Sequence, residues 1–187
     1  MGGKPQRLFV AISLPEVVQT KLTEISQEIA GTRWLQAPQR HLTLKFIGDV
    51  VSHRLTTVQG VLQNIGHRAF PLNLKGLGVF PLLGKPRILW IGMVNEPALM
   101  ELQGKIEHGL ARAGVCPAEP RVFEPHITLA RFKNFNSQQM MAYLDKHQSF
   151  VLEEFRVDCY HLFASELNRD GAVHKILQTY ELSNSEF

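Results

Sequence analysis

The sequence predicts an α+β fold with largely antiparallel sheets, in a single domain over residues 1–187. Three observations lead to this prediction. Segments with strand periodicity occur in neighbouring pairs, and single segments with helical periodicity lie between them. No linker rich in Gly, Ser or Pro divides the 187 residues. A short motif, His41-Leu42-Thr43-Leu44, returns as His126-Ile127-Thr128-Leu129, which indicates two similar lobes.

The N-terminal elements follow from apolar spacing. Residues 7–12 form a short apolar run rich in strand-forming residues, and a proline soon follows it. Residues 15–30 carry apolar residues at helical spacing, with Pro at the start and Gly just after the end. Residues 41–47 alternate between polar and apolar side chains and end in Gly-Asp, which is typical of a strand and turn. Residues 55–65 return to helical spacing.

The middle of the chain predicts a pair of strands followed by a helix. Residues 70–80 and 87–94 are the two expected strands, and Gly84-Lys85-Pro86 between them are turn residues. Residues 99–110 place four apolar side chains on one helical face, and a glycine follows.

The C-terminal third predicts three strands and one helix. Residues 123–132 form the strand that carries the second motif, and residues 137–147 form the helix. The closing strands are expected over residues 150–164 and 173–182. Asn168-Arg169-Asp170-Gly171 lies between them and is a strong turn signal.

Composition sets broad limits on the environment and the ligands. The formal net charge of +3 and the pI of about 9.0 fit an anionic ligand and a slightly basic surface equally well. The two cysteines, Cys116 and Cys159, are expected to be free thiols in a reducing compartment. No apolar run reaches the roughly 20 residues that span a bilayer. We therefore expect a cytoplasmic monomer with no membrane partner.

Each copy of the repeated motif divides its side chains between two faces. Alternation along a strand places His41 and Thr43 on one face, and His126 and Thr128 likewise, with the apolar residues on the other. Because histidine titrates near 6.5, one imidazole can activate water while the other protonates a leaving oxygen. Threonine hydroxyls can hydrogen-bond non-bridging phosphate oxygens. This set of groups suits in-line attack on a phosphodiester without a covalent nucleophile.

Two other functions compete with this interpretation. Paired histidines also occur in zinc sites, but the residue two positions after each histidine is Thr, a poor ligand, and no carboxylate shares either face. We therefore expect no metal and no other cofactor. An RNA-binding module without catalysis does not need two titrating groups, so both intact His-Thr pairs argue against it.

Several further segments flank the two motifs in a recognisable order. They are Arg7-Leu8-Phe9-Val10-Ala11-Ile12, Leu14-Pro15, Lys45-Phe46-Ile47-Gly48, Phe80-Pro81, Ile88-Leu89-Trp90-Ile91-Gly92, Pro125, Ala130-Arg131 and Leu162-Phe163-Ala164-Ser165. Together with the motifs they resemble the two-histidine phosphoesterase superfamily, and within it the bacterial and archaeal RNA 2',3'-cyclic phosphodiesterases, also known as 2'-5' RNA ligases. The resemblance spans nearly the whole chain.

The resemblance implies both a fold and a reaction. The fold would be bilobal, with two mainly antiparallel sheets, flanking helices and the two motifs across a central cleft. The reaction would open RNA 2',3'-cyclic phosphate ends to 2'-phosphomonoesters, with His41 as proton donor to the leaving 3'-oxygen and His126 as the base for water. Another cyclic-phosphate or 2'-5' linked substrate, or 2'-5' RNA joining by the reverse reaction, remains an alternative within the superfamily.

Four neighbouring residues are candidates for substrate contacts. Arg131 matches a family arginine that meets phosphate, although ideal alternation puts it on the wrong face unless a bulge re-aims it. Lys45 shares the face of His41 in an ideal strand and would add positive charge there or stay solvated. Phe9 and Phe46 are candidates for stacking on a base. The other histidines are interpreted as ordinary, including one where a family aromatic is common; they are His53, His67, His108, His147, His161 and His174.

Overall fold

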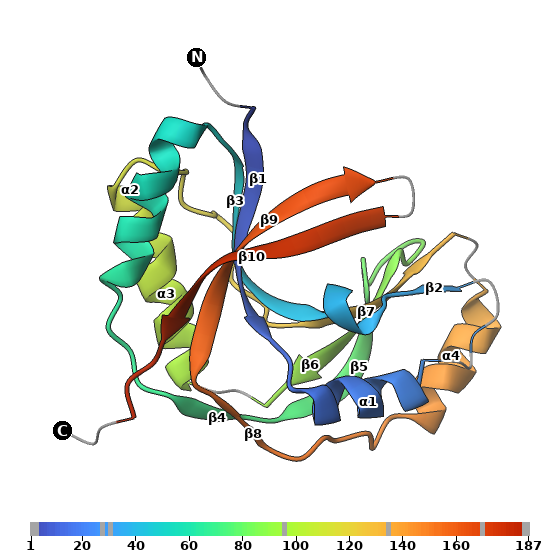
Figure 1. Ribbon diagram of the computed structural model, residues 1–187. Coiled ribbons are helices and arrows are strands. Elements are labelled where there is room, and N and C mark those ends of the chain that lie inside the picture. Colours follow the sequence, from blue (N-terminus) through green and yellow to red (C-terminus); the bar gives the residue numbers. More distant parts are fainter. Residues whose placement is uncertain are drawn as a thin grey trace.

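Paired strands and single helices alternate along the chain, as expected (Figure 1). The structure, a computed structural model, describes residues 4–26, 29, 32–94, 97–133, 136–168 and 171–184. The strands in these ranges are β1 (Gln6–Ser13), β2 (Thr32–Trp34), β3 (His41–Val50), β4 (Phe70–Leu72), β5 (Leu74–Phe80), β6 (Ile88–Met93), β7 (Ile127–Phe132), β8 (Phe155–Val157), β9 (Cys159–Asn168) and β10 (Gly171–Glu181). The helices are α1 (Glu16–Glu24), the 3-10 helix η1 (Ala37–Gln39), α2 (Ser52–Gln63), α3 (Pro97–Arg112) and α4 (Ser137–Lys146).

The strands form two antiparallel half-sheets that meet at one point. The first half-sheet has the order β10-β9-β1-β3, and the second continues with β7-β6-β5, with β2 paired to β7. In the described register, β3 and β7 match at a single pair, Leu42 and Ile127. The two expected sheets are therefore these halves, which that pair joins into one eight-stranded sheet. β4 and β8 form a separate two-stranded sheet.

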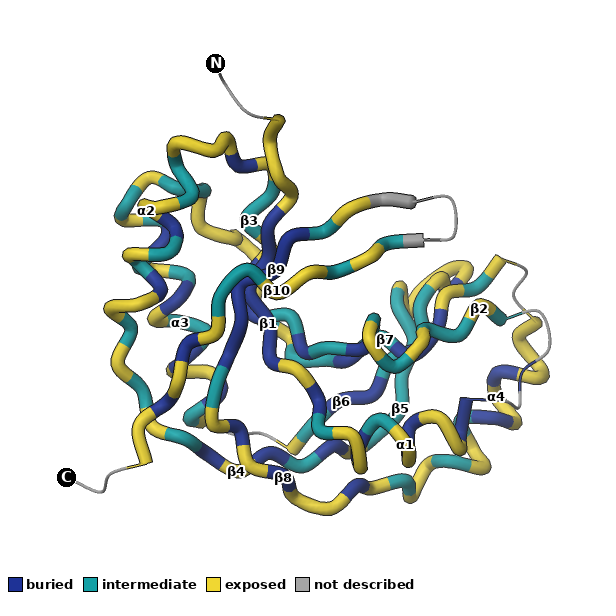
Figure 2. The backbone as a smooth tube through the Cα atoms, viewed as in Figure 1, coloured by how far each residue is buried: buried dark blue, intermediate teal, exposed yellow. Residues whose placement is uncertain are grey.

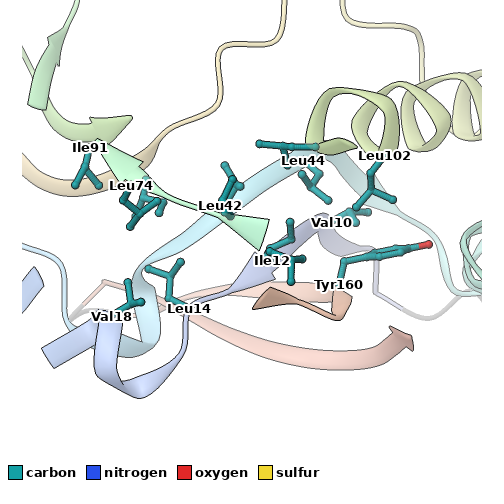
Figure 3. Close-up of a cluster of buried hydrophobic side chains, with 14 of the residues drawn as sticks. Val10, Ile12, Leu14, Val18, Leu42, Leu44, Leu74, Ile91, Leu102 and Tyr160 are labelled. Atoms are coloured by element: carbon teal, nitrogen blue, oxygen red, sulfur yellow. The ribbon is translucent and has the colours of Figure 1, made fainter. Parts of the chain in front are cut away.

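One face of the sheet carries the main core. Helices α2 and α3 pack against each other beside the first half-sheet, and α1 and α4 lie beside the second (Figure 1). Alternate strand residues such as Val10, Leu42 and Leu44 pack together there with the apolar side of α3 (Figure 3). Burial is densest where the central strands cross (Figure 2). The helices thus cover one face of the sheet with apolar side chains and leave the other face uncovered by these helices.

The opposite face carries a second, smaller apolar cluster. Phe9 and Ala11 on β1 pack with Phe163 on β9, apart from the main core. This explains why the five residues from Leu8 to Ile12 are all buried: alternate side chains of β1 are covered on both faces. The run at residues 7–12 therefore forms a strand that is buried from Leu8 to Ile12, with Arg7 exposed at its start.

Several expected elements differ from the structure in their extent or number. Helix α1 ends at Glu24 rather than at residue 30. The strand expected over 70–80 divides into β4 and β5, which belong to different sheets. The strand expected over 123–132 starts only at Ile127, after Pro125, which has no amide hydrogen to donate. The strand expected over 150–164 is broken into β8 and β9. The centre of the turn expected at 168–171 lies outside the described residues.

Cys116 and Cys159 are both free and partly buried, which confirms the prediction for the two thiols. In the described part of the chain, no helix combines the length and the apolar character needed to cross a bilayer.

Candidate active site

The first motif divides its side chains as the alternation predicts. On β3, Leu42 and Leu44 are buried in the main core, whereas His41 and Thr43 are half-buried on the opposite side. Thr43 lies across from Ala11 of β1, which belongs to the second apolar cluster. His41 and Thr43 therefore share the face of the sheet that is turned away from the main core. We call this the histidine face.

The second motif has the same arrangement at the start of β7. Ile127 and Leu129 are fully buried, and His126 and Thr128 are half-buried. His126 directly precedes the strand, and Thr128 lies opposite Trp90 of β6. Both His-Thr pairs thus occupy the histidine face, one on each half-sheet.

The single matched pair between the half-sheets brings the two motifs together. Leu42 and Ile127, which follow the two histidines, are partners in antiparallel register. In such a ladder the residues on either side of a matched pair also oppose each other. The register therefore directs His41 toward Thr128 and Thr43 toward His126. This register predicts an approximate two-fold relation between the two motifs, with the axis through the Leu42–Ile127 pair.

Each motif is followed by a register shift that changes which later side chains join this face. On β3 the shift lies between the Thr43–Ala11 and Lys45–Val10 pairs, which leaves Leu44 unpaired. On β7 it lies between the Thr128–Trp90 and Ala130–Leu89 pairs, which leaves Leu129 unpaired. One extra residue of this kind reverses the alternation beyond it. The fifth residue after each histidine, Phe46 or Arg131, consequently returns to the histidine face.

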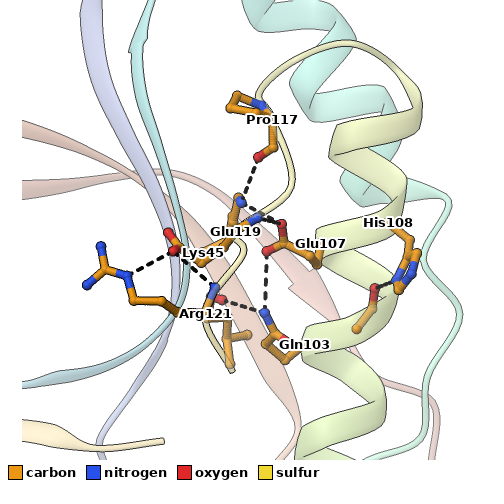
Figure 4. Close-up of polar contacts among 9 residues, drawn as sticks. Lys45, Gln103, Glu107, His108, Pro117, Glu119 and Arg121 are labelled. Carbon is orange, nitrogen blue, oxygen red and sulfur yellow. Dashed lines mark hydrogen bonds and ion pairs between the residues drawn. The ribbon is translucent and has the colours of Figure 1, made fainter. Parts of the chain in front are cut away.

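The shift on β3 corrects the expectation for Lys45. Lys45 points into the protein with only 7% of its side chain exposed, and its Nζ lies 2.6 Å from Glu107 Oε1. It also donates to the carbonyl of Pro117 at 3.1 Å (Figure 4). The same Glu107 oxygen accepts from the Glu119 amide at 2.7 Å. Lys45 is therefore neither solvated nor directed at a ligand. Through Glu107 and Pro117 it connects α3 to the segment that precedes His126.

The register shift on β7 is a bulge that brings Arg131 to the histidine face. Arg131 lies opposite Ile88, and Thr128 lies opposite Trp90, two residues further along β6. Because Ile88 and Trp90 share a face, Arg131 shares the face of Thr128. On its other side Arg131 is matched with Arg33 of β2, and both side chains are exposed. Two guanidinium groups opposite each other favour an anion between or beside them.

His41 rests in a cluster of rings. Its ring centroid lies 4.9 Å from that of Phe9, 5.2 Å from that of His174 and 6.1 Å from that of Phe163. The pKa of His41 is lowered to about 4: burial in this cluster is the largest cause, the positive charge of protonated His174 adds to it, and a hydrogen bond to the backbone of Gln39 partly opposes both. In the free protein His41 is therefore neutral at neutral pH.

His126 has its own aromatic neighbours and a fixed orientation. Phe80 contacts it edge-on at 5.1 Å, and Trp90 lies 6.4 Å away. His126 Nδ1 is 2.8 Å from the carbonyl oxygen of Glu124. A carbonyl can only accept, so Nδ1 carries the hydrogen and Nε2 is left to act as a base. The indole of Trp90 lies over Gly78, where an added Cβ would come within 2.2 Å of it.

The two phenylalanines expected to stack on a base differ in exposure. Phe46 is 70% exposed on the histidine face. Phe9 is only 3% exposed, since Phe163 stacks on it at 5.0 Å and His41, Phe46 and His174 contact it as well. This burial disfavours stacking of Phe9 on a base; its ring instead supports that of His41.

Four ring-bearing residues of the site were not singled out from the sequence. His174 had been interpreted as ordinary, and Phe163, Phe80 and Trp90 had been noted only as parts of matching segments. They surround His41 and His126 through pairings between distant strands, for which no local pattern gives a signal. In the described ranges, no three His, Cys, Asp or Glu side chains gather in a way that could hold a metal ion.

Comparison with known sequences gives a consistent result. A sequence model described as LigT like Phosphoesterase matches residues 12–90 and, a second time, residues 91–174, so each match contains one histidine motif. The RNA 2',3'-cyclic phosphodiesterase of Aquifex aeolicus is 31% identical over 178 residues, which cover 93% of this chain and 94% of that protein. The protein of the same description from Archaeoglobus fulgidus is 29% identical over 178 residues, which cover 94% and 99%.

Comparison with solved structures supports the same fold. The crystal structure of a Thermus thermophilus protein superposes with a TM-score of 0.79 at 28% identity, covering 94% of this chain and 97% of that one. E. coli LigT in its apo form gives a TM-score of 0.80 at 25% identity, covering 97% and 100%. The complex of E. coli LigT with 3'-AMP gives a TM-score of 0.78 at 25% identity over the same shares. The α+β fold and its internal repeat are thereby confirmed.

Proposed function

Because this chain belongs to the family of LigT-like phosphoesterases, we propose that it hydrolyses 2',3'-cyclic phosphate ends of RNA to 2'-phosphomonoesters without a metal ion. The observation that carries the proposal is the antiparallel pairing of Leu42 with Ile127. This pairing supports the proposal because it brings the two His-Thr motifs next to each other on the histidine face. The relatives described as RNA 2',3'-cyclic phosphodiesterases across nearly the whole chain support the substrate class.

In the proposed reaction one histidine accepts a proton from water and the other donates a proton to the leaving oxygen. His126 Nε2 accepts a proton from a water molecule, whose oxygen attacks phosphorus in line with the 3'-oxygen. The bond from phosphorus to the 3'-oxygen breaks, and His41 donates a proton to that oxygen. The product has a 2'-phosphate and a 3'-hydroxyl, and proton exchange with water resets the histidines. Thr43 and Thr128 donate hydrogen bonds to the non-bridging oxygens as negative charge develops there.

The neutral state of His41 in the free protein has to be reconciled with its role as a proton donor. A bound cyclic phosphate is an anion, and an anion beside an imidazole favours its protonated form. We therefore propose that His41 takes up its proton when the substrate binds. Arg131 would hold the phosphate from the side of β7, and Phe46 would stack on the terminal base. The crystal structure of E. coli LigT in complex with 3'-AMP supports a nucleotide as the ligand.

The first experiment is product identification. RNA with a 2',3'-cyclic phosphate end is incubated with the protein and EDTA, and the ends are separated by chromatography. We expect a 2'-phosphate end and undiminished activity in EDTA. A 3'-phosphate end, or loss of activity in EDTA that zinc restores, would refute the mechanism. No turnover but retained RNA binding would favour the alternative of a binding module, and 2'-5' joining without hydrolysis would favour the ligase alternative.

A second experiment separates the two histidine roles. A cyclic substrate with sulfur in place of the 3'-oxygen has a leaving group that needs little protonation. His41→Ala should lose activity on the order of a hundredfold with the oxygen substrate and regain most of it with the sulfur substrate, whereas His126→Ala should stay inactive on both. The reverse pattern would exchange the roles. Thr43→Ala and Thr128→Ala should each lose roughly 1.5–3 kcal/mol of transition-state stabilisation, less than either histidine variant.

A further inference from the structure

A third histidine lies against the proposed proton donor. His174 belongs to neither motif, but β10 pairs it with Ser165 of β9, which in turn pairs with Arg7 of β1. This row continues the histidine face. The rings of His174 and His41 are perpendicular, with centroids 5.2 Å apart, and His174 also meets Phe9 edge-on at 5.0 Å.

A hydrogen bond between the segments before the two histidines holds His41 and His174 close together. Gln39, two residues before His41, donates its side-chain amide to the carbonyl of Ala172 at 3.0 Å, two residues before His174. His174 Nδ1 is buried and has no hydrogen-bond partner in the described residues. An aromatic residue without ring nitrogens would make the same ring contacts and avoid this unsatisfied atom. The histidine therefore adds a titrating group beside His41 and nothing that packing alone requires.

We propose that His174 is a positioning residue for His41: its ring fixes the plane of the His41 imidazole, and its proton, when present, disfavours a proton on His41. Its importance for catalysis rests on the proposed function, in which His41 donates a proton. Whenever His174 is protonated, it opposes protonation of His41, and a bound cyclic phosphate offsets this effect because an anion stabilises the charge of both rings. The proton that His41 donates is thus taken up most readily in the presence of substrate.

The other charged groups on this face do not replace His174 in this role. Besides β7, whose Arg131 and preceding His126 belong to the site itself, four elements surround His41, namely β1, β9, β10 and η1, and β3 carries it. Their titratable or charged residues on the histidine face are Arg7 on β1, Asp49 on β3, His161 on β9, and His174 and Glu181 on β10. Of these, only His174 contacts the His41 ring among the described residues. Burial also lowers the pKa of His174 itself, so the two rings compete for one proton.

The direct test is the titration of the His41 ring followed by NMR in the full-length protein. His174→Phe keeps the ring and removes the charge. A unit charge at this centroid distance shifts a neighbouring titration by roughly half a unit to two units, so the His41 midpoint should rise by that amount. His174→Tyr is the second variant if Phe impairs folding. His53→Phe, on the exposed side of α2, is the matched control and should leave the midpoint unchanged. An unchanged His41 midpoint in the folded His174 variants would overturn the proposal.

Steady-state kinetics provide a separate readout. In His174→Phe the lower limb of the pH profile of kcat/KM should move upward with the NMR midpoint. His174→Ala, which also removes the ring, should lower kcat more than it raises KM. Without the neighbouring ring the His41 imidazole is no longer held in place, and its position matters most in the transition state. If no variant or wild-type protein turns over cyclic phosphates, the proposed function fails while the NMR result still decides this inference. Wild-type pH profiles in both variants would reduce His174 to a packing role.

Discussion

Replacing Lys45 by Met should destabilise the protein strongly, because Lys45 is buried in an ion pair. Lys45 takes no part in the proposed reaction. Lys45 Nζ and Glu107 Oε1 are 2.6 Å apart, and their side chains are only 7% and 13% exposed. Methionine fills a similar apolar volume and leaves the Glu107 carboxylate buried without its cation. Breaking a buried ion pair on one side costs about 3–5 kcal/mol because the remaining charge is uncompensated.

The lower end of that range applies to this site. Glu107 keeps two other donors, the Glu119 amide at 2.7 Å and Gln103 Nε2 at 3.4 Å. We therefore expect a loss of about 3 kcal/mol, which for a chain of this length lowers Tm by roughly 6–12 °C. Thermal unfolding followed by circular dichroism at pH 7 measures the shift.

Helix α3 also offers a matched control. Lys105 and Glu101 form an ion pair at 2.7 Å, but their side chains are 41% and 60% exposed. Solvent screens such a pair, which is worth about 0.5 kcal/mol at most, so Lys105→Met should change Tm by no more than about 2 °C. The double variant Lys45→Met/Glu107→Met should recover part of the loss, since it leaves no unpaired charge. A Tm for Lys45→Met within about 2 °C of wild type would refute the reasoning.

Three further predictions use separate features of the site. Gly78→Ala would force the Trp90 indole to move, because the new Cβ would lie 2.2 Å from it; the variant should have a lower kcat/KM and a free energy of unfolding lower by roughly 1–3 kcal/mol. The control Gly104→Ala in α3 has open space around the new Cβ and should leave stability unchanged or raise it. Unchanged kinetics in Gly78→Ala would contradict this prediction. Phe46→Ala should raise KM for a cyclic nucleotide with little change in Tm, because the ring is 70% exposed, and a large loss of stability would show that it packs instead. The pKa of His41 falls to about 4 on folding, so the unfolded state binds more protons and stability should decline as pH drops from about 6.5 to 4; His41→Asn should show a smaller decline in urea titrations, and an equal decline would count against the low pKa.

Local alternation was sufficient to predict the motifs and their faces. In both copies the residues two apart share a side, and the burial of Leu42 and Ile127 follows from the same pattern. The register shifts after the motifs could not be predicted, because a bulge is defined by the partner strand rather than by its own sequence. For that reason Lys45 was placed on the wrong face, and the position of Arg131 depended on a bulge that only the structure describes.

Partners distant in sequence account for the other differences. The segment 70–80 looks continuous, but β4 pairs with β8 and β5 pairs with β6, and nothing within the segment specifies this choice. His174 is similar: its place on β10 is evident from the turn before it, but its neighbour His41 lies on β3, at the other end of the order β10-β9-β1-β3. Pairing across the sheet, rather than any local signal, turns an ordinary histidine into part of the site.

The axis through the Leu42–Ile127 pair also bears on how a substrate is oriented. Rotation about it exchanges His41 with His126, so the motifs alone present the same groups to a phosphodiester entering in either direction. Direction must come from residues that the rotation does not preserve. Two such residues are the fifth residues after each histidine, a phenylalanine on β3 and an arginine on β7, which the two bulges bring to equivalent places. Under the proposed function, the phenylalanine end of the site stacks on a base and the arginine end binds a negative charge, and this polarity would assign different tasks to two otherwise interchangeable histidines.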